Sequence, residues 1–122
     1  MQLKKLPYCL TICKLASADP VCLSEDFCFV AVTDEEISLV CRTEHTPDAV
    51  VARDDGWRGF RIEGPLDFSL TGILSGLSSV LAENRIGIFA VSTFDTDYIL
   101  VKQENFDRAA AVLEAAGYAI LN

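Results

Sequence analysis

The stretch SLTGILSGLSSVLAENRIGIFAVSTFDTDYILV, residues 69–101, decides the fold of this chain. In residues 69–84 the apolar side chains recur at spacings of three and four, which predicts an amphipathic helix. Two apolar runs follow, residues 86–92 and 98–102, and they predict two strands around the loop 93–97. Helix, strand, loop and strand in this order are typical of the middle of a ferredoxin-like unit.

The flanking residues complete that unit. Residues 57–63 predict a strand before the first helix. Asn105 is expected to cap a second helix, which ends where Gly117 favours a left-handed C-cap, and residues 118–121 predict a closing strand. The second half therefore predicts the order β-α-β-β-α-β, with two helices covering one face of an antiparallel sheet.

The first half resembles a degenerate copy of the same unit. Strands are predicted at residues 6–15, 27–33 and 37–42, and residues 43–56 are expected to be a linker. Ala31 aligns with Ala90 at an offset of 59 residues and Ile37 with Tyr98 at an offset of 61, which predicts two extra residues in the second loop. We expect an α+β chain of two ferredoxin-like units in tandem, with the degenerate unit at 1–56 and the complete unit at 57–122.

Charge and hydropathy limit the classes of partner. The net charge of −8, from 10 basic and 18 acidic residues, argues against nucleic acid, because binding phosphates needs a basic face. The longest apolar runs are shorter than the roughly 18 residues that a membrane span needs. The first residues also lack the apolar core of a signal peptide. We therefore expect a cytoplasmic protein that binds neither nucleic acid nor membrane.

Cysteine and histidine usage argues against catalysis. The five cysteines all lie in the first third of the chain and are expected to be buried thiols, with Cys9 and Cys13 on one side of the same strand. His45 is the only histidine and lies in the predicted linker. The sequence contains no zinc-ligand spacing, Walker-type glycine loop or dinucleotide fingerprint. We therefore expect no enzyme, no cofactor and no metal site.

Gly72 and Asp97 have the chemistry of a ligand site. A helix start near Gly72 offers backbone N–H groups and a positive dipole end to an anion, and Asp97 offers a carboxylate to a cation. A free amino acid carries both charges. Two alternatives stay open, namely that Gly72 only permits tight packing and that Asp97 only ends a turn. Phe94 is expected to be half core and half pocket wall, and Arg58 and Arg61 are expected to be solvated.

Three motifs resemble a known family. The segments EGPLDFSLTGIL (63–74) and IGIFAVSTFDTDYILV (86–101) closely resemble small bacterial proteins built from tandem ACT domains. The segment VTDEEISLVC (32–41) resembles the first-domain hairpin of those proteins. The family is similar to the regulatory ACT pairs of aspartate kinases and to the cytosolic arginine sensor of animal cells. The resemblance implies an amino-acid-binding regulatory module rather than a catalyst.

The resemblance also implies a site. In such proteins the amino acid lies between ACT units, with its carboxylate at the glycine-containing helix start and its ammonium on the aspartate that follows the hairpin loop. The implied ligand-binding residues are Leu70, Thr71, Gly72, Ile73, Thr93, Phe94, Asp97, Ser38 and Leu39.

Two functions follow from these features. In the first, the protein is an allosteric sensor, in which a small amino acid shifts the interface of a homodimer or of a regulated protein partner. The alternative is an ACT-fold oligomerisation scaffold without a working ligand site.

Overall fold

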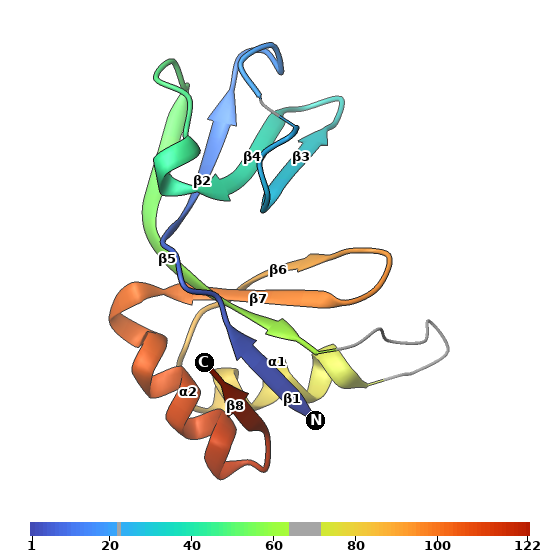
Figure 1. Cartoon of the computed structure of the whole chain (residues 1–122), viewed down its shortest axis with the longest axis vertical. Coiled ribbons are helices and arrows are strands. Elements are labelled where there is room, and N and C mark those ends of the chain that lie inside the picture. The colour runs from blue at the N-terminus through green and yellow to red at the C-terminus, as the bar shows by residue number, and fades with distance from the viewer. Residues whose placement is uncertain (22, 64–71) are drawn as a thin grey trace. The chain divides into compact units, whose positions relative to one another are not determined.

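The computed structural model describes residues 1–21, 23–63 and 72–122, which form two compact units (Figure 1). We call Tyr8–Trp57 the N-terminal unit, and Met1–Pro7 together with Arg58–Asn122 the C-terminal unit. The division expected from the sequence, 1–56 and 57–122, differs from this one chiefly in the first seven residues, which pack with the C-terminal unit.

The C-terminal unit is a sheet with two α-helices. Its elements are β1 (Gln2–Lys5), the last part of β5 (Ala52–Ile62), α1 (Ile73–Glu83), β6 (Phe89–Ser92), β7 (Asp97–Lys102), the 3₁₀ helix η2 (Gln103–Asn105), α2 (Phe106–Ala115) and β8 (Ala119–Leu121). The strand order is β6-β7-β5-β1-β8, with β1 antiparallel to β5 and parallel to β8. This is the predicted βαββαβ unit, with the N-terminal strand β1 inserted between its first and last strands.

The predicted strand 6–15 begins only at Leu10, as β2 (Leu10–Leu15), and the inserted strand β1 lies before it, in residues for which the sequence predicts no strand. An irregular connection joins β1 to β2. Pro7 lies in this connection, and a strand through it is disfavoured because proline has no N–H for a ladder. Leu3 of β1 is only 1% exposed and belongs to the core of the C-terminal unit. Cys9 lies in the connection and is exposed whereas Cys13 is buried, so placing both thiols on one side of a strand is wrong.

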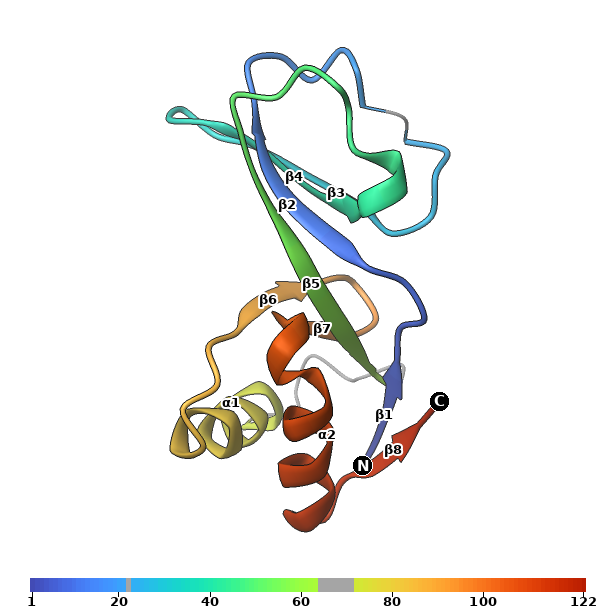
Figure 2. The same cartoon turned by 90° about the vertical axis from the view of Figure 1, so that its left-hand side faces the viewer.

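Both helices cover one face of the C-terminal sheet (Figure 2). The buried core of this unit consists of Leu3, Phe60, Ile62, Leu77, Leu81, Ile86, Ile99, Val101, Phe106, Ala109, Ala110 and Leu113. The α2 helix ends as predicted, with Gly117 at φ 104° and its N–H donating to the carbonyl oxygen of Glu114 at 3.0 Å. Asn105 stands at the N-cap position of α2, but the predicted side-chain cap is wrong, because its side-chain oxygen accepts a hydrogen bond from Arg108 at 3.2 Å instead of one from the helix backbone.

The N-terminal unit has the same strand order without the helices. Its elements are β2, β3 (Cys28–Val32), β4 (Ile37–Arg42), the 3₁₀ helix η1 (Thr43–His45) and the first part of β5. The order β3-β4-β2-β5, antiparallel throughout, is that of a ferredoxin-like sheet. Residues 46–51 and the described residues of 16–27 are irregular where that fold has helices. The unit is therefore the degenerate copy that the sequence predicts.

The predicted linker 43–56 is wrong, because its last residues form the start of β5. The charges at Arg53 and Asp55 suggest a solvated loop, but they are paired within the unit. Arg53 donates to both carboxylate oxygens of Asp55, and buried Thr11 donates to the same carboxylate at 2.6 Å. Gly56, at φ 81°, lies where the register of β5 against β2 shifts, as in a glycine-containing β-bulge. A strand can form here despite its polar sequence, because its charges are paired and the bulge accommodates the shift in register.

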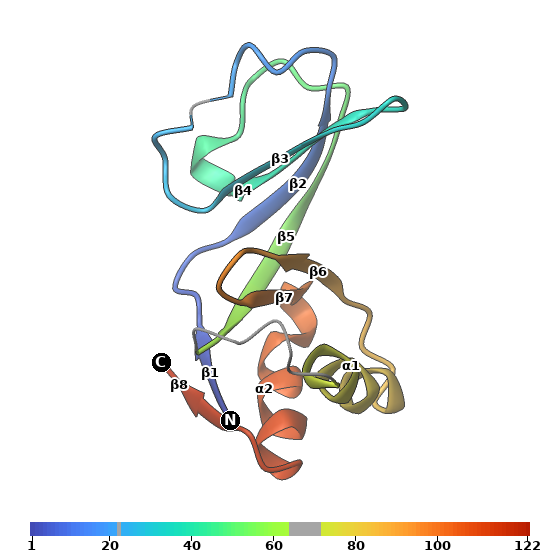
Figure 3. The same ribbon diagram turned by 90° about the vertical axis from the view of Figure 1, so that its right-hand side faces the viewer.

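The β3–β4 and β6–β7 hairpins close with the same turn (Figure 3). The N–H of Thr33 donates to the carbonyl oxygen of Glu36 at 2.9 Å, and the hydroxyl of Thr33 accepts the N–H of Glu36 at 3.1 Å. In the second hairpin the N–H of Thr93 donates to the carbonyl oxygen of Thr96 at 2.8 Å, and the hydroxyl of Thr93 accepts the N–H of Thr96 at 3.3 Å. The two turns therefore have equal length.

The strands beside these turns fix one offset for the repeat. Val32 pairs with Ile37 in the first hairpin and Ser92 with Asp97 in the second, an offset of 60 residues at both positions. The offsets of 59 and 61 are therefore wrong, and so is the prediction of two extra residues in the second loop. Loop length thus gives no reason to place a ligand at the second hairpin, and any such reason must come from its side chains.

Replacing Thr96 by valine tests what holds the second turn. The Thr96 hydroxyl donates to the buried carbonyl oxygen of Ile62 at 2.5 Å, and valine keeps the shape of the side chain without that donor. We expect the free energy of unfolding to fall by about 1–3 kcal/mol in urea titrations. Glu36→Gln, at the matched and exposed position of the first turn, should change it by less than about 0.5 kcal/mol. Equal losses in the two variants would contradict this role of Thr96.

Candidate functional site

Asp97 lies on the helix-covered face of the C-terminal sheet. It is the first residue of β7, and successive side chains of a strand point to opposite faces. Ile99 and Val101 belong to the core under the helices, so Asp97, two residues before Ile99, shares their face. The side chain is half-buried. Its carboxylate is thus directed to the layer that contains α1 and α2.

Gly72 directly precedes α1 on that same face. It occupies the N-cap position at φ 77°, and its carbonyl oxygen accepts the N–H of Gly76 at 2.8 Å. Because this left-handed conformation is not helical, the helix begins at Ile73, whose side chain packs against the core. The backbone N–H groups of the first turn are therefore what this position offers to an anion. Leu70 and Thr71 lie outside the described residues.

The turn before Asp97 is fastened to the end of β5. Thr96 is buried, and its hydroxyl bonds to Ile62 at the end of that strand. Figures 1 and 3 show that this turn, the end of β5 and the start of α1 lie at one end of the C-terminal unit. The structure thus brings Gly72, Ile73, Thr93 and Asp97 to the same end.

Phe94 differs from its predicted role. Its side chain is 81% exposed at the turn, so the expected half-core position is wrong. The turn directs residue 94 away from the sheet, because the backbone of residues 93–96 is closed by the bonds of Thr93. A role as the wall of a ligand site remains open to this side chain.

Two arginines of β5 are less solvated than the sequence suggests. Arg58 donates to the backbone oxygen of Leu6 at 3.1 Å, and its guanidinium lies 4.3 Å from the ring centroid of Phe106. Arg61 forms an ion pair with Glu63 at 3.0 Å. The hydrogen bond from Arg61 to Glu63 is the first cause that raises the pKa of Arg61. Both cations are therefore already engaged within the C-terminal unit.

Ser38 and Leu39 occupy β4 of the N-terminal unit. Leu39 is 1% exposed and belongs to the core of that unit. As its neighbour in the strand, Ser38 points to the opposite face. A ligand on one face of this sheet can therefore touch the side chain of only one of the two. At the offset of 60 they correspond to Tyr98 and Ile99.

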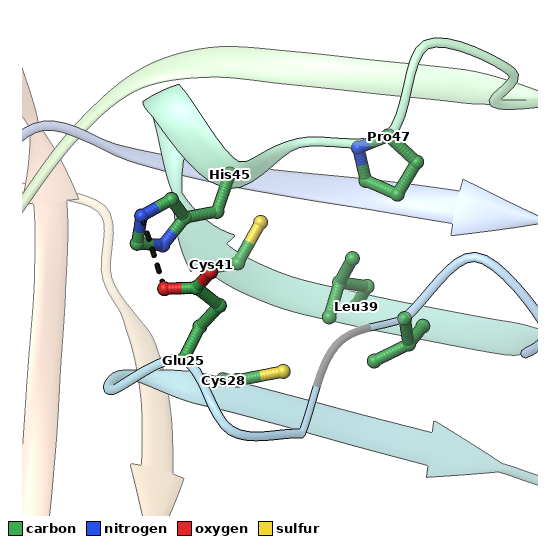
Figure 4. A pocket seen from close by; sticks show the side chains of 7 residues that line it. Glu25, Cys28, Leu39, Cys41, His45 and Pro47 are labelled. Carbon is green, nitrogen blue, oxygen red and sulfur yellow. Dashed lines mark ion pairs between the residues drawn. The ribbon is translucent and has the colours of Figure 1, made fainter.

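A small pocket lies within the N-terminal unit (Figure 4). It is lined by Val21, Glu25, Cys28, Leu39, Cys41, His45 and Pro47. Its volume of about 20 Å³ compares with the roughly 10–15 Å³ that one water needs, so it is too small for an amino acid. The Nε2 atom of His45 lies 3.3 Å from a carboxylate oxygen of Glu25.

Burial governs the thiols beside this pocket. Desolvation raises the pKa of both Cys41 and Cys13. Cys28 and Cys41 are register partners that were not predicted as a pair; the signal for the pair is that each lies five residues from one end of the turn 33–36. Among the described residues, no three or more His, Cys, Asp or Glu side chains are grouped so as to hold a metal ion. The described part of the chain also contains no helix of the length and apolarity needed to cross a membrane.

Comparison with known proteins points to one family. A family model described as an ACT domain matches residues 52–115. A solved structure of a protein from Agrobacterium tumefaciens is 36% identical, with a TM-score of 0.86 over 98% of this chain and 91% of that one. The search of curated proteins finds no match.

More distant structures share the fold. A protein of unknown function from Vibrio cholerae is 17% identical, with a TM-score of 0.71 over 93% of this chain and 88% of that one. Aspartate kinase from Synechocystis is 14% identical, with a TM-score of 0.72 over 99% of this chain and 27% of the kinase. Aspartate kinase from Clostridium acetobutylicum, described as an allosteric enzyme, is 13% identical, with a TM-score of 0.64 over 93% of this chain and 33% of the kinase.

The backbone of Gly72 gives a direct test of the helix start. Among the described residues, nothing lies within 4 Å of a Cβ placed at Gly72, so the cost of Gly72→Ala comes from its φ of 77°. We expect this variant to lose about 1–2 kcal/mol of unfolding free energy. Gly87→Ala is the matched control, since its Cβ also meets no described atom and its φ is not positive. Urea unfolding should leave the control unchanged or slightly stabilised, and equal losses in both variants would refute the strain at Gly72.

Proposed function

Because this chain belongs to the ACT-domain family, we propose that it is an amino-acid-binding regulatory module. ACT domains are regulatory ligand-binding modules, and that general role extends to this chain. The finer proposal concerns the ligand, which is a free α-amino acid bound in the C-terminal unit. The observation that carries it is the placement of Asp97 on the face that α1 covers, with Gly72 at the start of that helix.

The start of α1 is the proposed carboxylate site. The first turn of a helix has backbone N–H groups without intrahelical partners, and the helix dipole adds about 0.3–1 kcal/mol toward an anion at an exposed site. Gly72 is exposed and lacks a Cβ, so a carboxylate can approach these N–H groups closely. Leu70 and Thr71 remain part of this proposal by their place in the motif.

Asp97 is the proposed ammonium site. A hydrogen bond to a charged group contributes about 1.5–3 kcal/mol, which corresponds to roughly 10- to 150-fold in affinity. The fastened turn before Asp97 supports this role, because a carboxylate held in place loses little conformational entropy on binding. Backbone groups of Thr93 and Phe94 complete the site in the proposal, with the exposed Phe94 ring as one wall.

The repeat supports a ligand role for Asp97 in one further way. The matched position of the first hairpin is Ile37, which packs against the core of the N-terminal unit. An apolar residue therefore suffices at this position for the hairpin to form. A carboxylate at the same position of the second hairpin is not needed to close the turn, which weighs against the alternative that Asp97 only ends a turn.

A thermal-shift panel of the common amino acids tests the proposed function. A ligand at about 100 times its dissociation constant should stabilise the protein by about 2.7 kcal/mol. We expect at least one amino acid to raise the melting temperature. If none does at millimolar concentration, the oligomerisation scaffold without a working site becomes the better account.

Replacing Asp97 by asparagine tests the ammonium site. With the amino acid found in the panel, we expect Asp97→Asn to weaken binding roughly 10- to 150-fold in calorimetry while the fold stays intact. Asp95→Asn is the matched control, because it removes the same charge from an exposed position in the same turn. If Asp97→Asn binds as tightly as the parent, Asp97 does not hold the ligand.

The edge strand β6 supports self-association as part of the proposal. In the described residues β6 pairs only with β7, so its other edge is open to a second strand. A homodimer joined at such an edge gives the ligand an interface to shift. Light scattering should then give twice the chain mass, and a monomer at all working concentrations would exclude this mode of regulation.

A further inference from the structure

Two cysteines face each other across the β3–β4 hairpin. Cys28 and Cys41 are direct register partners in this antiparallel pair. Side chains that are directly opposite point to the same face of the sheet, and both line the pocket of the N-terminal unit (Figure 4). The juxtaposition follows from the turn, since each cysteine is five residues from one of its ends, Thr33 and Glu36.

The turn also fixes the type of pair. The N–H of Thr33 donates a ladder hydrogen bond to the carbonyl oxygen of Glu36, and hydrogen-bonded and non-hydrogen-bonded pairs alternate outward from these two residues. Five steps out, Cys28 and Cys41 form a non-hydrogen-bonded pair, with Cα atoms about 4.5 Å apart. Disulfides span Cα separations of about 4.4–6.8 Å. The backbone is therefore already within reach of a bond, and only the side chains have to turn.

We propose that Cys28 and Cys41 are a redox-active dithiol that closes to a cross-strand disulfide when it meets a hydroperoxide. The Cys28 thiolate attacks one oxygen of the hydroperoxide, the O–O bond breaks, and the alcohol leaves, or water where the oxidant is hydrogen peroxide. Cys28 is then a sulfenic acid. The Cys41 sulfur attacks the Cys28 sulfur, the S–O bond breaks, and the Cys41 proton leaves with the hydroxyl as water.

Burial assigns the two roles. Cys28 is half-buried on β3, which pairs only with β4 among the described strands, so the oxidant can reach it. Cys41 is 2% exposed and lies 3.7 Å from the hydroxyl of Thr46, and burial raises its pKa, which suits a thiol that resolves the sulfenic acid rather than one that meets the oxidant.

Cys13 lies on the same face but is not the partner. Its register partner is Leu39, so it is diagonal to Cys41 rather than opposite. Diagonal neighbours are about 7–8 Å apart, beyond the reach of a disulfide without backbone movement. Cys13 is therefore a built-in control for the proposal.

The test treats the folded full-length chain with hydrogen peroxide, blocks the remaining thiols with N-ethylmaleimide and digests without reductant. Cleavage after Glu25, Glu35 or Glu36, and Glu44 puts Cys28, Cys41 and Cys22 on separate peptides, which trypsin would leave joined. We expect one linked species, containing Cys28 and Cys41. A link from Cys28 to any other cysteine, or alkylation of both thiols as in the untreated protein, would overturn the proposal.

Three variants assign the steps. Cys41→Ser should abolish the disulfide and leave a sulfenic acid at Cys28 that dimedone traps, whereas Cys28→Ser should abolish both products. Cys13→Ser should form the Cys28–Cys41 bond at the rate of the parent. The same treatment in concentrated urea separates geometry from chance pairing. If the unfolded chain forms this bond as fast as the folded chain, the hairpin register has no part in it and the proposal fails.

Discussion

The alternation of side chains along β7 is the constraint on which the candidate site depends. Ile99 and Val101 are buried under the two helices, and moving them to the other face would cost on the order of 1.5–3 kcal/mol each in lost burial. Ile99 and Val101 therefore fix the register of β7, and this register determines the face of the sheet on which Asp97 lies. The position of Asp97 is thus set by the burial of its apolar neighbours in the strand.

The two hairpins show how one backbone turn accepts different side chains at a matched position. In each turn a threonine hydroxyl accepts the backbone N–H of the residue three positions later. The strands that follow the turns, β4 and β7, have the same pattern of burial. What differs is the side chain at the matched position, Ile37 in one hairpin and Asp97 in the other. Ile37 packs against the core of its unit, and Asp97 is the residue proposed to hold a ligand.

Much of the fold could be predicted from residue periodicity, and the failures have local causes. The apolar faces of α1 and α2 could be predicted because apolar residues recur every three or four positions along the sequence. The left-handed conformation of Gly117 could be predicted from the residue type and its place after the helix. The polar start of β5 could not be predicted, because pairing of Arg53 with Asp55 is a tertiary property. The insertion of β1 could not be predicted either, since its partners are far away in sequence. For the candidate site, residue chemistry alone points to Gly72 and Asp97, whose role stays a prediction, whereas the exposure of Phe94 depends on how the turn is directed.

The place of β1 has a consequence for how the protein is made. Gln2 pairs with Ala119 and Leu3 with Ile120, so β1 can complete its pairing only after β8, far along the chain, has been synthesised. The N-terminal unit, by contrast, consists of one continuous segment, so all of its strands are available as soon as that segment has been synthesised. The side chain of Leu3, which is buried in the finished core, therefore cannot be fully covered until β8 has been made, and β1 then becomes an inner strand between β5 and β8.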